Sequence, residues 1–108
     1  MKTERKLCLA LKSMMSEQPL ESISVIALTK KCNIYRQTFY YHFHDIYDLL
    51  SLVYIEEKID KINEVENVND LLEKIFSYYS NNSKFIEATL NSNAKDLFKE
   101  FVYNNCLQ

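Results

Sequence analysis

Residues 35–47 concentrate side chains that can contact DNA. Six of the fourteen aromatic residues of the chain lie in YRQTFYYHFHDIY, beside Arg36, Gln37, Thr38 and both histidines. Arginine pairs with guanine and glutamine with adenine through two hydrogen bonds each, and threonine can contact a base edge. Tyrosine hydroxyls and histidine rings can donate hydrogen bonds to phosphates. The stretch therefore has groups suited to reading bases and groups suited to holding the backbone.

Helical spacing predicts how these side chains are presented. Phe39 and Phe43 are four positions apart, so they share one face of a helix and can anchor it to a core. The side chains left outside are those with hydrogen-bonding groups: Tyr35, Arg36, Gln37, Tyr40 and Tyr41.

The surrounding sequence predicts a helix-turn-helix motif over residues 24–43. Ser24 is a good N-cap for a short helix over 25–31, and a break at 32–34 precedes a second short helix over 35–42. Another helix, over 3–17, comes before the motif. Asp45 then caps a long helix predicted over 46–62, which has apolar residues on more than one face and would link two parts of the molecule.

Three further helices are predicted after this linking helix, over 70–80, 84–90 and 94–104. The first of them has a broad apolar face that includes Leu72 and Phe76. The chain has no glycine and ten asparagines, and the lack of glycine argues against hairpins and sheets. We therefore expect an all-α fold of seven helices, divided into a head (residues 1–62) and a partial helical regulatory or dimerisation domain (residues 63–108).

Charge is distributed unevenly along the chain, with a change of sign after residue 44. Residues 1–44 carry seven Lys and Arg against three Asp and Glu, a net charge of +4, whereas residues 45–108 carry six against twelve, a net charge of −6. A basic first part suits a polyanion-binding head on an acidic body, although chance placement of surface charge would give the same count.

Other classes of protein are disfavoured. Cys8, Cys32 and Cys106 have no spacing typical of a disulfide framework or a zinc site, and the two histidines point to different sides of a helix, so we expect no metal ion and no cofactor. No catalytic motif is found, so we expect no enzyme and no catalytic residues. The charged N-terminus lacks an apolar signal core, and no apolar run is long enough to span a bilayer, so we expect a cytoplasmic protein without a membrane segment.

TFYYHF at 38–43 followed by DIYDLL at 45–50 resembles the signature of the TetR family of bacterial transcriptional regulators. The resemblance covers roughly residues 4–60, and RQTFYYHFHDIYDLL is most similar to the branch that contains dihydroxyacetone-kinase regulators. Ile46 stands where a lysine is common in the family, so Tyr47 would have to supply that phosphate contact. The resemblance assigns one set of residues to DNA, with Ser24 near the phosphates, Tyr35, Arg36, Gln37 and Thr38 facing the major groove, and Tyr40, Tyr41 and His42 on the backbone.

The resemblance implies sequence-specific binding of double-stranded DNA at a palindromic operator, transcriptional regulation, and control by a small-molecule effector or a protein partner. It also implies a homodimer in a complete chain. Family members run longer than this sequence, so we expect the 108-residue chain to dimerise weakly or not at all, with an uncovered apolar row around Phe98, Phe101, Val102 and Leu107. An alternative of another class is a protein-interaction module on the same scaffold, with weak or no DNA binding. That alternative would need a larger apolar patch on the exposed surface of the head.

Overall fold

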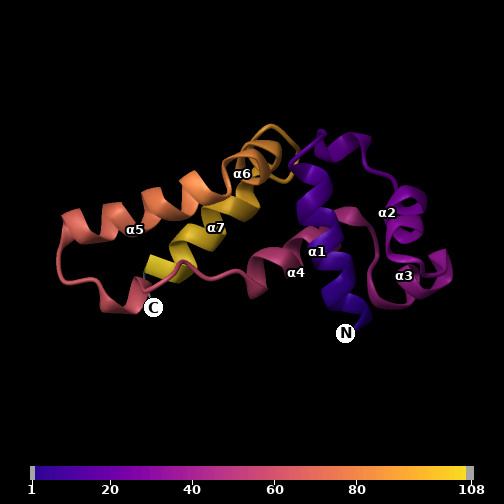
Figure 1. The fold of residues 1–108 in the computed structure, drawn as a ribbon, viewed down its shortest axis with the longest axis horizontal. Coiled ribbons are helices and arrows are strands. Elements are labelled where there is room, and N and C mark those ends of the chain that lie inside the picture. Colours follow the sequence, from indigo (N-terminus) through magenta and orange to yellow (C-terminus); the bar gives the residue numbers. More distant parts are fainter. Residues whose placement is uncertain (1, 107–108) are drawn as a thin grey trace.

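The computed structural model describes residues 2–106, and within that range the chain is all-α, as predicted (Figure 1). The helices follow one another in the order α1 (Thr3–Met15), α2 (Val25–Cys32), α3 (Arg36–His42), α4 (Ile46–Glu56), α5 (Val68–Asn81), α6 (Ser83–Leu90) and α7 (Lys95–Cys106), with short 3-10 turns at Leu20–Ser22 and Ile62–Glu64. Every predicted helix is present, and all but α4 have ends within one or two residues of the prediction. Leu107, which the sequence placed in an uncovered apolar row, lies outside the described residues.

Side-chain caps fix where α2 and α4 begin. The Ser24 hydroxyl oxygen accepts a hydrogen bond from the N–H of Ala27 at 3.0 Å, and the Asp45 carboxylate accepts one from the N–H of Asp48 at 2.9 Å. The Asp48 carboxylate in turn accepts the N–H of His44 at 2.9 Å. Such caps satisfy backbone donors that have no partner inside the helix. Both caps were predicted from the sequence. The segment between them, residues 24–45, contains α2 and α3.

The predicted long helix over 46–62 is wrong, because α4 ends at Glu56. The backbone of Glu57 is extended, with ψ of 144°, and the Glu57 carboxylate forms a half-buried ion pair with Lys12 of α1. Ile59 is 3% exposed in the core. These two distant contacts outweigh the modest helix propensity of the stretch EEKIDK, whose residues would continue the helix if they were judged locally. No single long helix therefore links the head to the rest of the molecule.

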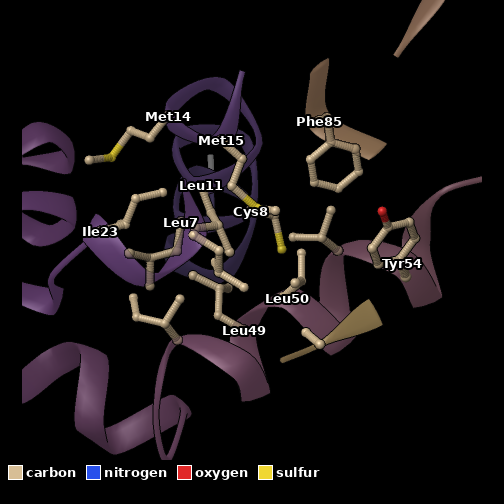
Figure 2. Packing of buried hydrophobic residues seen from close by; sticks show 14 of the residues in the cluster. Leu7, Cys8, Leu11, Met14, Met15, Ile23, Leu49, Leu50, Tyr54 and Phe85 are labelled. Atoms are coloured by element: carbon tan, nitrogen blue, oxygen red, sulfur yellow. The ribbon is translucent and has the colours of Figure 1, made fainter. Parts of the chain in front are cut away.

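The core is built around α1, which packs on α2, α4 and α6. Figure 2 shows Leu7 and Leu11 of α1 next to Leu49 and Leu50 of α4, and all four side chains are fully buried. Cys8 lies on the side of α1 that faces the second half of the chain, in the same buried cluster as Phe85. One continuous hydrophobic cluster thus holds the helix-turn-helix end of the molecule against α6 and α7.

The molecule is elongated, with principal extents of 47 × 25 × 19 Å. In Figure 1, α2 and α3 lie at one end of the long axis and α5 lies at the other, where it runs in the opposite direction to α7. The Tyr78 ring of α5 contacts the Phe101 ring of α7, with centroids 5.0 Å apart. Among the residues that the structure describes, no helix combines the length and the apolar character that crossing a membrane requires.

Candidate nucleic-acid interface

The turn between α2 and α3 is a local structure that needs a left-handed residue. Asn33 has φ of 57° and ψ of 47°, a conformation that asparagine adopts more readily than most residues other than glycine. Its N–H donates to the carbonyl of Lys30 at 3.1 Å, and the N–H of Ile34 donates to the carbonyl of Thr29 at 3.0 Å. This pair of bonds is the usual helix C-terminal cap. It terminates α2 and turns the chain into α3 without a glycine.

Two phenylalanines anchor α3, as predicted from their spacing. Phe39 is 0% exposed and Phe43 is 7% exposed, and their ring centroids lie 5.5 Å apart. The Tyr40 ring packs edge-on against Phe39 with centroids 5.2 Å apart, which positions Tyr40 while leaving about half of it in solvent. One side of α3 is therefore fixed by packing, and the opposite side is free to contact a ligand.

That opposite side of α3 presents most of the residues that the sequence assigned to DNA. We use the term α3 surface for the exposed residues on and beside this helix: Tyr35, Arg36, Gln37, Tyr40, Tyr41 and His42. Four of these six residues, Arg36, Gln37, Tyr40 and Tyr41, lie within roughly 140° of the helix circumference, since successive residues are about 100° apart. Thr38 is half-buried at the edge of the α3 surface. The separation into buried phenylalanines and outward tyrosines agrees with the prediction.

Two other candidate residues have partners within the protein. The Ser24 oxygen is used as the α2 cap, although its own O–H stays available as a donor. The Tyr47 hydroxyl donates to the Glu21 carboxylate at 3.0 Å, and this bond raises the pKa of Tyr47. The same Glu21 oxygen accepts the N–H of Asn93 at 3.3 Å. A phosphate contact by Tyr47 would have to replace the bond to Glu21. Sequence reasoning did not foresee Glu21, because an acidic residue in a short polar turn gives no pattern.

Some of the positively charged side chains of residues 1–44 form ion pairs within the molecule. Arg5 lies 3.7 Å from the carboxylate of Glu56, and Lys12 is paired with Glu57, so two of the seven cations counted in residues 1–44 are held by α4 and the residue after it. Among the ion pairs of residues 2–106, none involves Lys30, Lys31 or Arg36. All three are exposed in α2 and α3, around the turn. Lys2 and Lys6 are likewise exposed and outside these ion pairs, so the cations available to a polyanion are three around the turn and two near the N-terminus.

Other polar side chains form contacts away from the α3 surface. The Tyr54 hydroxyl and the Thr89 hydroxyl form a buried hydrogen bond of 2.8 Å, and burial raises the pKa of Tyr54. His44 is exposed beside Asp45, and the N–H of Asp48 lowers the pKa of that carboxyl group. Within residues 2–106, no group of three or more His, Cys, Asp and Glu side chains is arranged to hold a metal ion.

A cleft of about 520 Å³ lies between α4 and α7, and Tyr54, Lys58, Phe101 and Asn105 are among its lining residues. Its wall is mixed, since rings and amides alternate with charged groups. Phe101, which the sequence placed in an uncovered apolar row, is only 3% exposed, so that expectation is wrong for this residue.

No family model matches the chain, and neither a characterised protein nor a solved structure is matched by it. The functional conclusion therefore depends on the geometry of the α3 surface and on the sequence signature described above.

Proposed function

We propose that the chain is a sequence-specific DNA-binding regulator of transcription in which α3 is the recognition helix. The observation that carries this proposal is the division of α3 into two sides. One side is anchored by Phe39 and Phe43, and the other exposes an arginine, a glutamine and several tyrosines. A recognition helix needs that combination, because it must be held rigidly while its outer residues enter the major groove.

The exposed groups divide naturally between bases and backbone. Arg36 and Gln37 stand in the first turn of α3, where residues of recognition helices reach base edges. Tyr40 and Tyr41 follow one turn later and can donate to phosphates. The N-terminus of α2, capped by Ser24, has free backbone donors that suit a phosphate oxygen.

The signature TFYYHF with DIYDLL supports a regulator of the TetR type, and with it a bacterial cytoplasmic protein that binds paired half-sites of a palindromic operator. Control by a small molecule or a protein partner belongs to the same proposal.

A protein-interaction module with little DNA affinity is the alternative. It would be favoured by a broad apolar patch beside α3, but the exposed apolar groups of this end are mainly tyrosines, whose hydroxyls suit phosphates, together with Ile26. The longer apolar stripe of the molecule lies on α5 instead. The composition of the α3 surface therefore favours DNA.

Selection of binding sites from random duplex DNA tests the proposal directly. We expect enrichment of one short motif, and gel shifts that show tighter binding of the selected site than of random DNA. Arg36→Ala should lower that preference by about 1–3 kcal/mol, the range for a bidentate base contact. The matched control is Arg5→Ala, which removes the same charge from α1. Base reading by α3 would be contradicted if no motif were enriched. It would also be contradicted if Arg36→Ala lowered the affinity for the selected site and for random DNA equally.

A further inference from the structure

We propose that Lys2 and Lys6, at the start of α1, bind DNA phosphates beside the bases that α3 reads. The inference rests on the proposed function and deepens it, because it adds a contact surface outside the helix-turn-helix motif. We use the term α1 lysine pair for Lys2 and Lys6. The role proposed for the pair is to position the DNA, since a contact to a phosphate carries no sequence information directly.

The starting observation is that α1 directs its cations to different sides. Arg5 and Lys12 are seven residues apart, so they lie on one side of the helix, where carboxylates at and just after the end of α4 form ion pairs with them. At about 100° per residue, Lys6 lies roughly 100–120° around the helix from both. The N–H of Lys6 donates to the carbonyl of Lys2 at 3.1 Å, so Lys2 precedes Lys6 by one turn. Both side chains are exposed and lie outside the ion pairs of the described residues, which leaves them available to an external anion.

The α1 lysine pair lies beside the turn of the helix-turn-helix motif. The thiol of Cys32, the last residue of α2, donates to the backbone carbonyl of Lys6 at 3.6 Å. Burial raises the pKa of this thiol, and the charges of Lys6 and Lys31 oppose the rise, so both lysines lie near it. Figure 1 shows the start of α1 at the same end of the molecule as α2 and α3. The positive charge around the turn therefore continues onto a third helix.

Few acidic groups oppose this charge. Residues 22–44 contain no aspartate or glutamate, and they include Lys30, Lys31 and Arg36. Glu4 stands between the two members of the α1 lysine pair in the sequence, but it lies about 160° around the helix from each of them. A DNA duplex carries one negative charge per about 1.7 Å of its axis, so cations spread over several helices can each meet a phosphate.

The side-chain type favours phosphates over bases as the target. The lysine ammonium is a point charge on a flexible stem, whereas a bidentate base contact needs a planar group such as the guanidinium of Arg36. An acidic protein would also be attracted to two lysines. The neighbouring α3 surface, however, presents groups suited to bases and to phosphates, so a single duplex can use both surfaces.

The double variant Lys2→Gln/Lys6→Gln tests the proposal, and Lys95→Gln/Lys99→Gln is the matched control. Lys95 and Lys99 are also exposed and four residues apart, but they lie on α7, away from α3 (Figure 1). Both double variants lose the same charge, so any long-range attraction of DNA is weakened in both. Far-ultraviolet circular dichroism verifies that each is folded.

Gel shifts at several salt concentrations measure the contribution of the pair. The α1 double variant should bind selected and random DNA more weakly, and its slope of log affinity against log salt concentration should fall by about two, one for each contact. Because each contact contributes about 0.9 to that slope, the wild type should lose roughly 60-fold more affinity than this variant over a tenfold rise in salt. The α7 control should keep nearly the wild-type slope.

Ethylation of single phosphates locates the contacts. Among the phosphates whose ethylation weakens wild-type binding, one or two should no longer matter in the α1 double variant, whereas the control should keep the wild-type pattern. Equal salt slopes in the two double variants would overturn the role of the α1 lysine pair and leave base reading by α3 intact. A loss confined to the selected site would also overturn it, since phosphate contacts are independent of sequence. A wild-type chain that binds no duplex DNA would overturn both this inference and the proposed function.

Discussion

Replacing Phe39 with alanine separates a structural role from a DNA-contacting role. The Phe39 side chain is 0% exposed and packs against the Phe43 ring with centroids 5.5 Å apart. Truncation of a buried phenylalanine to alanine costs about 3–5 kcal/mol, since both the transfer energy and the packing around the ring are lost. A domain of this size has a total stability of about 5–15 kcal/mol, so the change removes a large part of it.

The expected shift is large enough to measure by thermal unfolding. At about 4–8 °C per kcal/mol, Phe39→Ala should lower the melting temperature by at least roughly 12 °C. Phe76→Ala is the matched control: that ring is 69% exposed, and its loss should change the free energy of unfolding by about 0.5 kcal/mol or less at low protein concentration. DNA binding should fail together with folding in Phe39→Ala. If the variant kept the wild-type melting temperature and lost only DNA affinity, the ring would have to face the groove, and the assignment of the two sides of α3 would be wrong.

Three further outcomes follow from the structure. Lys31→Ala should weaken binding to selected and random DNA alike and reduce the slope of log affinity against log salt concentration by about one. Gel shifts at several salt concentrations measure both effects. A loss of affinity confined to the selected site would indicate a base contact instead. Asn33→Ala should destabilise the fold by about 1 kcal/mol in urea unfolding, whereas Asn33→Gly should not, because only the alanine opposes a φ of 57°. Burial raises the pKa of Cys8 from 9.0 to about 11 and also raises the pKa values of Tyr54 and Tyr78. Since these folded-state pKa values exceed the unfolded ones, their contribution to stability is complete below about pH 9 and is lost as the pH rises through them. Urea midpoints measured across that range should therefore fall, and Cys8→Ala should delay the fall.

Features set by neighbouring residues were predictable from the sequence. Ser24 and Asp45 mark helix starts because a cap bonds to a backbone N–H three residues away. Phe39 and Phe43 share a face because they are four residues apart, and their apolar character predicted that this face is the buried one. The fold class and the presentation of the α3 surface rest on such short-range rules, which explains why they were correct.

Features set by distant residues were not predictable. Nothing near Glu57 indicates that Lys12, far away in the sequence, will draw it out of the helix. The bond between Tyr47 and Glu21 likewise depends on how the head packs. The apolar face of α5 was recognised from its spacing, but spacing does not tell whether a neighbouring helix covers Leu72. In each case the missing information is the tertiary arrangement.

Glu21 connects the head to the C-terminal helices through hydrogen bonds that an exchange experiment can follow. One carboxylate oxygen of Glu21 joins the 3-10 turn before α2 to Tyr47 of α4 and to the Asn93 amide between α6 and α7. These bonds are exposed, so they can open without unfolding the core. The exchange rate of the Asn93 amide hydrogen therefore reports how often the head and the C-terminal helices separate at this point. Comparing that rate with and without DNA would measure how far binding at α3 stiffens the rest of the chain.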